Sequence, residues 1–287
     1  MNTSPPKLFD EKALAFAKSR ARKRQARRGG SFLYQRAAQD AASRLEDIQR
    51  QFKHAVMIGA QDGRNLFKSE ISSDRIPETF DYVQSGDQLT DKYDLIISLL
   101  ELQSDDALPE TLMRFRHHLS PDGLLLVAQF GGESLTELRQ SLYGTDQTIL
   151  GGATPRIFPM VDYSQAAMLL GKIGLALPVI DTDRITVFYS ALKNLISDLR
   201  DLGLSNSLIA RDKRPLPKAW WVKLNEIYAQ HFARENDGKL KATFEILWLT
   251  GWAPHESQQK PLKPGSCLLY TSPSPRDRTR SRMPSSA

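Results

Sequence analysis

Apolar residues fall in short runs of strand length, separated by stretches in which they recur at helical spacing. The runs predict strands at 54–59, 80–83, 93–100, 124–130, 185–189 and 243–250. Helical spacing predicts helices at 34–52, 64–67, 109–118, 135–142, 163–172, 192–202 and 217–232. Continuous apolar strands that alternate with helices indicate a parallel sheet covered on both faces. Right-handed crossovers then give a doubly wound α/β domain.

Several small or polar residues lie at or shortly after the ends of the predicted strands. They are Gly59, Asp87, Ser98 and the pair Gly131-Gly132. In doubly wound sheets, ligands bind outside the carboxyl ends of the strands. We therefore expect these residues to converge on one crevice.

The first two of these turns carry candidate chemistry for a nucleotide-like ligand. Residues 56–63 read VMIGAQDG, a strand that runs into closely spaced glycines and lets the backbone approach a ligand. A plain strand-to-helix turn explains the same pattern. Asp87 could accept a hydrogen bond from an adenine amino group, whereas an Asx-turn in a surface loop is the alternative.

The order of the motifs is more specific than any one of them. A glycine loop is followed by YDLIIS at 93–98, a helix, the SPDG turn at 120–123 and the apolar strand LLLV. This order resembles that of class I methyltransferases. Three further stretches, GGESLTELR at 131–139, GGATPR at 151–156 and residues 242–261, closely resemble the bacterial relatives of complex I assembly factor 5. The neighbouring family is the biotin-pathway malonyl-carrier-protein O-methyltransferase, and the resemblance covers about residues 8 to 266.

The resemblance implies a Rossmann-like class I methyltransferase sheet with a helical C-terminal lid. It implies S-adenosyl-L-methionine as cofactor, and it implies a protein or carrier-bound substrate, with a respiratory complex I subunit as one option. The residues that would bind the cofactor are Gly59, Ala60, Gln61, Gly63, Asp87 and Ser98. For the eukaryotic branch, arginine hydroxylation is proposed in place of methylation, and a non-catalytic assembly factor on the same fold is the rival hypothesis. A bacterial member is expected in the cytoplasm, with the inner-membrane surface as a further option, and a eukaryotic member in mitochondria.

The cofactor loop departs from the family pattern at several positions. Met57 stands where the family has an acid, and Met57 cannot accept a hydrogen bond as a carboxylate does. Gln61 replaces the middle glycine and adds a side chain where the backbone must pass close to the ligand. The segment 63–87 is short for a helix, a strand and a second helix, and it offers only Glu70 and Asp74 to hold the ribose. Residues 102–106 lack the aromatic ring of the family's Leu-His-Trp-type loop.

The substrate side is assigned from residues after the fourth predicted strand and near residue 255. Glu133 is the candidate catalytic base, from its place after that strand. Substrate or partner contacts are expected at Gly131, Gly132, Arg139, His255 and Glu256. Arg139 and Arg156 could bind a carboxylate or phosphate through paired hydrogen bonds, or could serve surface and helix packing. His255 and Glu256 provide too few ligands for a metal, so no metal site is predicted.

Composition sets the domain boundaries and limits the partners. Residues 1–30 form a basic N-terminal arm, which is a solvated helix face or else a phosphate or nucleic-acid arm. The methyltransferase-like domain spans 31–266, with its core at 54–132 and the lid and last strands at 133–266. Residues 267–287 lack any hydrophobic period, and we expect a disordered tail from sequencing-adapter read-through. That tail carries +3 of the formal charge of +6, which removes the case for a nucleic-acid partner. No apolar run reaches the roughly eighteen residues of a membrane span.

Overall fold

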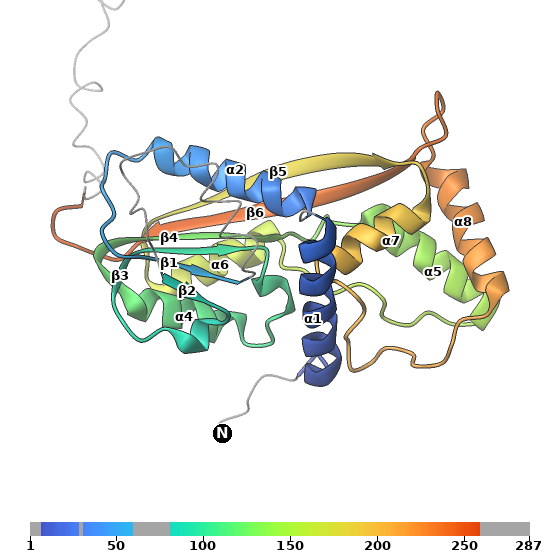
Figure 1. Ribbon diagram of the computed structural model, residues 1–287, viewed down its shortest axis with the longest axis horizontal. Helices are drawn as coiled ribbons and strands as arrows, with labels where there is room; N and C mark the ends of the chain where they lie inside the picture. Colours follow the sequence, from blue (N-terminus) through green and yellow to red (C-terminus); the bar gives the residue numbers. More distant parts are fainter. Residues whose placement is uncertain (1–6, 29–30, 60–80, 259–287) are drawn as a thin grey trace, which may run out of the picture. The chain divides into compact units, whose positions relative to one another are not determined.

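The structure is a computed structural model that describes residues 7–28, 31–59 and 81–258. The chain divides into two units, Met1–Pro254 and His255–Ala287, and the fold described here is that of the first unit. Its helices are α1 (Glu11–Arg28), α2 (Phe32–Glu46), α4 (Leu108–His118), α5 (Thr136–Leu150), α6 (Tyr163–Ile173), α7 (Leu192–Asp201) and α8 (Lys218–Phe232), shown in Figure 1. Its strands are β1 (Ala55–Ile58), β2 (Asp81–Val83), β3 (Tyr93–Leu99), β4 (Leu119–Phe130), β5 (Ala176–Tyr189) and β6 (Leu240–Trp252). Two short 3₁₀ turns, η1 (Gly86–Gln88) and η2 (Leu102–Ser104), follow β2 and β3.

The six strands form one sheet in the order β2-β1-β3-β4-β6-β5. The first four strands are parallel, whereas β6 is antiparallel to both β4 and β5. The predicted α/β fold class is thereby confirmed, and the sheet ends in an antiparallel pair. The short helix expected at 64–67, the acids Glu70 and Asp74 and the tail 267–287 lie outside the described residues.

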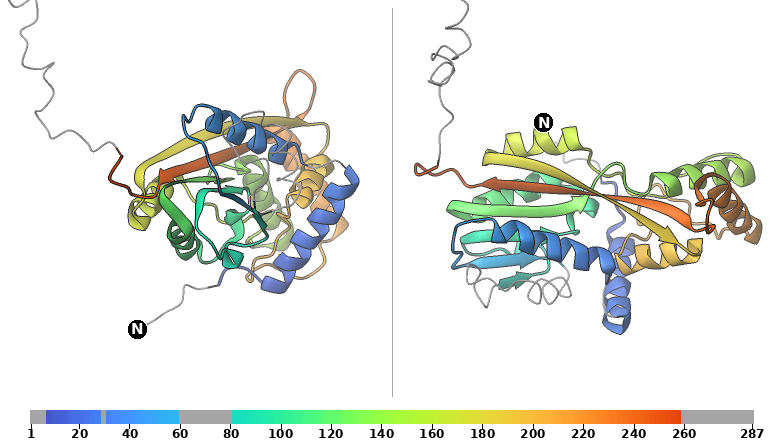
Figure 2. Two further views of the ribbon diagram at one scale, coloured as in Figure 1. Left: turned by 60° about the vertical axis from the view of Figure 1, so that its left-hand side comes forward. Right: turned by 90° about the horizontal axis from the view of Figure 1, so that it is seen from above.

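Helices cover both faces of the sheet, as Figure 2 shows. One core cluster joins α2, α5, α7 and α8 to one set of strand side chains, including Met57, Leu95 and Trp248. The second cluster joins α4 and α6 to the alternate set, including Val56, Ile96 and Leu249. Successive strand residues point to opposite faces, so a strand buried by helices on both sides must be apolar throughout. This requirement explains the continuous apolar runs in the sequence.

The β5–β6 ribbon continues past the carboxyl end of β4. Phe130 is the last residue of β4 that pairs with β6, opposite Ile246, while 183–189 and 240–246 continue to pair with each other. Helices α5 and α8 contact β6 and each other, and α7 contacts β5. The helices expected as a C-terminal lid therefore pack on a strand ribbon beyond the parallel half of the sheet.

Two boundaries differ from the sequence expectation for identifiable reasons. The helix predicted to reach residue 52 ends at Glu46. The residues before β1 bond to Asp94 instead of continuing the helix, because its carboxylate accepts from the backbone N–H groups of Lys53 and His54, at 2.6 and 2.9 Å. The turn predicted at 120–123 is an irregularity inside β4, with Asp122 in the left-handed region at φ +60°. Its backbone bonds to Ala253, which follows β6, so the turn is incorporated into the sheet.

Candidate functional site

Gly59 ends β1 and turns the chain at the carboxyl edge of the sheet. Its φ of +124° is a conformation that residues with a side chain rarely adopt. Its N–H donates to the carbonyl of Val83 at 3.1 Å, and its own carbonyl accepts from the Tyr82 hydroxyl. A Cβ at this position would collide with the side chain of Glu101. The close neighbour of Gly59 is thus the Glu101 side chain. The approach to a ligand expected here stays a prediction, and Ala60, Gln61 and Gly63 lie outside the described residues.

Two adjoining cavities occupy this edge of the sheet. One, of about 60 Å³, lies beside Gly59 and is bounded by α1, Tyr34 of α2 and the residues that follow α7. The other, of about 260 Å³, lies beside Asp87 and η2. Their shared walls are Lys18, Gln84, Glu101 and Ser104. The fold therefore brings Gly59 and Asp87, predicted from separate motifs, into one groove.

Asp87 lines the second cavity with an exposed side chain. Its side chain is 72% exposed and forms an ion pair with Arg114, and such exposed pairs contribute little to stability. The backbone N–H of Asp87 donates to the Ser85 hydroxyl, so the turn interpretation of this segment also holds. A carboxylate in the wall of a cavity can accept a hydrogen bond from an amino group.

Ser98 and the glycine pair do not join this groove. Ser98 is fully buried within β3, and among the described residues its hydroxyl has no hydrogen-bond partner. Gly131 and Gly132 follow β4 and contact β6 and the start of α6 instead. The cofactor role expected for Ser98 thus lacks an exposed hydroxyl in this structure.

Glu101 and Lys18 line the groove and were not singled out from the sequence. The Glu101 side chain is 15% exposed, and its Oε2 lies 3.3 Å from Nζ of Lys18. Its Oε1 accepts from the Tyr34 hydroxyl at 3.1 Å. Glu101 comes two residues after β3 ends, so the rule that ligands bind at carboxyl ends could have found it. Lys18 carried no such signal, because it is 83 residues away in sequence.

The stretches that carry the family resemblance contact each other directly. The N–H of Gly131 donates to the carbonyl of Glu245 at 2.9 Å, and the Glu245 carboxylate accepts from the N–H of Glu133 at 3.0 Å. A Cβ at Gly131 would collide with that carboxylate. Glu133 itself is exposed and is not part of the wall of either groove cavity. Its expected role as a base is untested by this geometry.

A buried carboxylate joins α5 to β6 in the same region. Glu137 accepts from Thr243 twice, from the backbone N–H at 3.0 Å and from the hydroxyl at 2.6 Å, and Lys241 lies 3.4 Å away. Burial alone would raise the pKa of Glu137, but these hydrogen bonds and Lys241 outweigh it and lower the pKa below its usual value. Glu137 is therefore an ionised structural link.

Arg139 borders a separate, mainly apolar cavity of about 410 Å³. The cavity is lined by Leu8, Gly132, Pro155, Ile157, Phe158, Pro159, Met160, Leu208 and Ala210 besides Arg139. The guanidinium donates to the carbonyls of Gly132 and Ser134, each at 3.3 Å. Among the described residues that line this cavity, Arg139 is the one cationic group on an apolar wall, so a ligand would combine an apolar body with an anionic or hydrogen-bond-accepting group.

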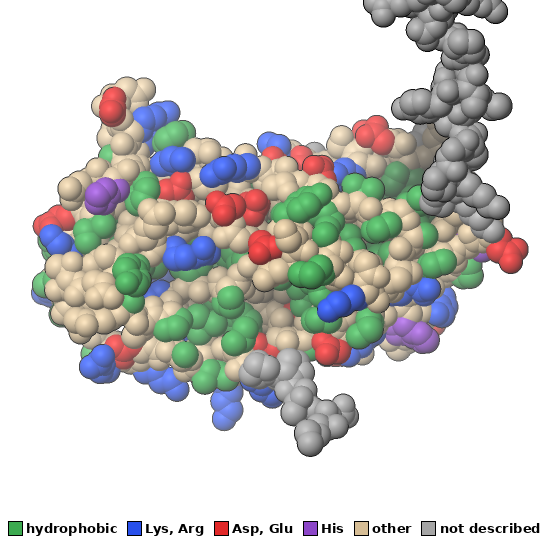
Figure 3. Space-filling view, turned by 180° about the vertical axis from the view of Figure 1, so that it is seen from behind, with side chains coloured by type: hydrophobic (Ala, Val, Ile, Leu, Met, Phe, Trp, Pro, Cys, Tyr) green, Lys and Arg blue, Asp and Glu red, His purple; other side chains and the backbone are tan. Residues whose placement is uncertain are grey.

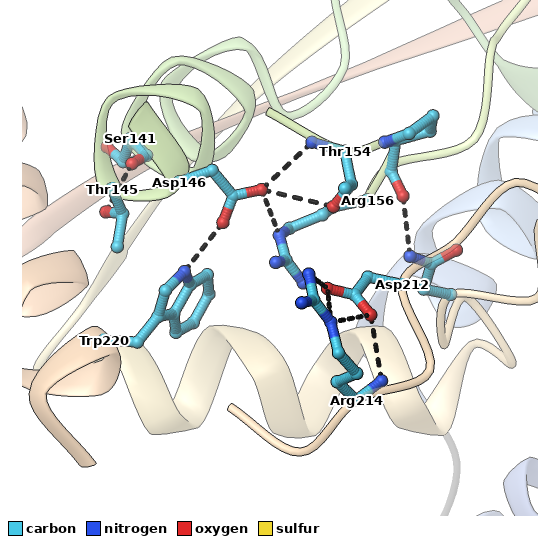
Figure 4. A network of polar contacts seen from close by, with 10 residues as sticks. Ser141, Thr145, Asp146, Thr154, Arg156, Asp212, Arg214 and Trp220 are labelled. Carbon is cyan, nitrogen blue, oxygen red and sulfur yellow. Dashed lines mark hydrogen bonds and ion pairs between the residues drawn. The ribbon is translucent and has the colours of Figure 1, made fainter. Parts of the chain in front are cut away.

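Arg156 instead binds a carboxylate of the protein itself, as Figure 4 shows. Its Nε lies 2.7 Å from Asp146, whose side chain is 1% exposed. The Asp146 carboxylate also accepts from the Trp220 indole at 2.7 Å and from Thr154. Burial would raise the pKa of Asp146, but the bonds from Arg156, Trp220 and Thr154 lower it below the usual value. The packing role left open for Arg156 is the one observed.

His255 and Glu256 lie in the second unit of the chain and are exposed. The His255 ring contacts the Ser257 hydroxyl at 2.7 Å. Within residues 7–28, 31–59 and 81–258, no group of three His, Cys, Asp or Glu side chains could hold a metal ion. None of the described helices is long and apolar enough to cross a membrane. On the face drawn in Figure 3, basic and acidic side chains are interspersed with hydrophobic ones.

Comparisons with known proteins place these features in a family. No protein-family model matches the chain. The structure aligns with a Bacillus halodurans protein assigned as a methyltransferase over 76% of this chain and 99% of that one, with a TM-score of 0.46 and 10% identity. The sheet order, the reversed strand β6 and the glycine turn after β1 define a class I methyltransferase fold.

Proteins similar in sequence identify the family more narrowly than the fold does. The arginine-hydroxylase NDUFAF5 of Danio rerio is 30% identical over 82% of this chain and 79% of its own length. The Dictyostelium discoideum protein of the same name is 37% identical over 62% of this chain, and the match spans only 41% of that relative. The malonyl-[acyl-carrier protein] O-methyltransferase of Laribacter hongkongensis is 29% identical over 63% of this chain and 58% of its own. The chain belongs to the arginine-hydroxylase NDUFAF5 family, as the resemblance indicated.

Proposed function

We propose that the groove beside Gly59 and Asp87 binds S-adenosylmethionine and that the protein is an S-adenosylmethionine-dependent enzyme acting on a protein or carrier-bound substrate. The observation that carries this proposal is the meeting of two separate strand ends in one groove. Gly59 provides a bare backbone in the left-handed region, and Asp87 provides an exposed carboxylate in the adjoining cavity.

The residues present fit this cofactor at both ends of the groove. Gly59 presents its backbone without a side chain, where an added Cβ would collide with Glu101, and Asp87 would accept a hydrogen bond from the adenine amino group. When bound, the sulfonium group of the cofactor supplies an electrophilic methyl group. The contribution of the protein is then mainly positioning, with a base where the acceptor is protonated. Glu133 stays the proposed base, from its place after β4.

The substrate end is proposed to be the cavity beside Gly132 and Arg139. Its apolar wall and single guanidinium suit a side chain or acyl chain that ends in an accepting group. A subunit of respiratory complex I is the proposed protein partner, and His255 and Glu256 are proposed partner contacts. The proposed location is the bacterial cytoplasm, at the inner-membrane surface where it meets its partner, or the mitochondrion in a eukaryote.

A second candidate is an arginine hydroxylase or a non-catalytic assembly factor on the same fold. Met57 favours it, because the position of the family's acid is held by a methionine that is 1% exposed and packed in the core. The NDUFAF5 relatives are themselves named arginine-hydroxylases. Capture of a complex I subunit by purified protein in the absence of any cofactor would favour the assembly role over methyl transfer.

Calorimetry with S-adenosylmethionine tests the proposal. We expect binding to the wild-type protein, loss of binding in Gly59→Val and weaker binding in Asp87→Asn, where the exposed side chain leaves folding unaffected. Gly152→Val is the matched control, because no heavy atom of the described structure lies within 4 Å of a Cβ placed there. No heat of binding to wild-type protein at millimolar ligand would end the methyltransferase proposal.

A further inference from the structure

We infer that Lys18 and Glu101 form a recognition site for the amino-acid end of the ligand, with Glu101 supplying the carboxylate that is missing at Met57. The inference rests on the proposed function and names residues for it. An α-amino acid group carries an ammonium and a carboxylate on one carbon. The complement of that group is a carboxylate and an ammonium held side by side.

The two side chains meet this requirement at the right place. Nζ of Lys18 and Oε2 of Glu101 are 3.3 Å apart, and both side chains line the two cavities of the groove. The Glu101 carboxylate lies against Gly59, where an added Cβ would be 3.2 Å from its Oε1. Glu101 therefore borders the backbone turn that a methionine moiety would approach.

Tyr34 fixes the carboxylate from the opposite side. Its hydroxyl donates to Oε1 of Glu101 at 3.1 Å, so one oxygen is held while the other faces Lys18. A ligand ammonium could replace the Lys18 ammonium at that second oxygen, and the released Lys18 could then bind the ligand carboxylate. Each exchange substitutes one charge-assisted hydrogen bond for another, so no charge is left unpaired.

The size of the cavity beside Gly59 also indicates such an exchange. About 60 Å³ is far below the roughly 300–1,000 Å³ of ordinary ligand pockets. Lys18 and Glu101 line both this space and the cavity of about 260 Å³ beside Asp87. Parting the pair would join the two into a continuous site. In the ligand-free protein, Lys18 and Glu101 thus pair with each other, and in the complex each would pair with the opposite charge of the ligand.

Paired ligands give a sharp test. S-adenosylhomocysteine carries the amino-acid end, whereas 5′-methylthioadenosine keeps the adenosine thioether and lacks that end. Binding of both is measured by calorimetry to wild type, Glu101→Gln and Lys18→Met. We expect each substitution to weaken S-adenosylhomocysteine about tenfold or more and to leave 5′-methylthioadenosine within about twofold.

Controls and outcomes separate this inference from the function on which it rests. Lys12→Met and Glu110→Gln remove an exposed charge from α1 and α4 and should change neither affinity. Thermal unfolding without ligand checks that each variant is folded. If wild type binds S-adenosylhomocysteine and both substitutions leave that affinity unchanged, or weaken the two ligands equally, the inference is wrong while the proposed function stands. If wild type binds neither ligand, both are wrong.

Discussion

At the scale of single residues, the side chains that the sequence marked as chemical divide into two groups. Asp87 lines the groove at the carboxyl edge of the sheet, whereas Arg156 binds a carboxylate inside the protein. Arg156 and Asp146 are a buried pair, and removal of one member leaves the other charge without compensation. The exposed Lys223–Glu226 pair, at 3.1 Å on α8, is the opposite case.

Asp146→Asn should lower the free energy of unfolding by about 3 kcal/mol, because the guanidinium of Arg156 loses its buried counter-charge. The Asn side chain keeps an acceptor for Trp220, which limits the loss. Glu226→Gln, the matched change in an exposed pair, should cost less than about 0.5 kcal/mol. Urea unfolding measures the loss in free energy of unfolding for each variant. Equal losses in Asp146→Asn and Glu226→Gln would contradict the account of the buried pair.

The same carboxylate makes stability depend on pH. The pKa of Asp146 is lowered in the folded state from its ordinary value of 3.8, so its contribution is complete above that value. The contribution is lost as the pH falls further, through the folded-state pKa. Unfolding measured between about pH 6 and pH 3 should show a steeper loss for wild type than for Asp146→Asn. Parallel curves would show that folding does not lower the pKa of Asp146.

At the scale of elements, capping and burial decide which predictions were accurate. Helix α4 begins within a residue of its predicted start, because Pro109 occupies the first turn and fixes the backbone there. Strand β5 was predicted only at 185–189 but begins at Ala176. Its additional residues are mostly exposed and include Asp181 and Asp183, which form ion pairs with α2. The added segment reads ALPVIDTDR, with a proline among its apolar residues and polar residues after them, so it lacks the pattern by which strands are found.

The N-termini of two helices offer a matched pair of substitutions. Asp162 caps α6, its carboxylate accepting from the N–H of Gln165 at 2.8 Å, whereas the buried Ser31 hydroxyl makes no cap bond to α2. Asp162→Ala should therefore cost about 1 kcal/mol of stability. Ser31→Ala should cost nothing or stabilise slightly, because it removes a buried hydroxyl that is without a partner in the described structure. Urea denaturation midpoints compare the two, and a larger loss in Ser31→Ala would refute this assignment of caps.

At the scale of the whole first unit, topology explains what the sequence could reveal about the site. Gly59 and Asp87 follow strands, so a sheet rule that needs only the order of elements brings them together. Lys18 reaches Glu101 across 83 residues, and Trp220 reaches Asp146 across 74. Such contacts depend on how helices pack on the finished sheet, and no local pattern encodes them. The order of elements could thus bring Gly59 and Asp87 together, while the contact of Lys18 with Glu101 could not be predicted.

The central claim is that one groove at the carboxyl edge of the sheet holds an S-adenosylmethionine-type ligand. A crystal structure of the protein grown with saturating S-adenosylhomocysteine tests it most directly. The account predicts ligand density that passes Gly59, with the adenine beside Asp87 and the amino-acid end between Lys18 and Glu101. An empty groove with the Lys18–Glu101 pair intact, or ligand bound elsewhere on the protein, would contradict it.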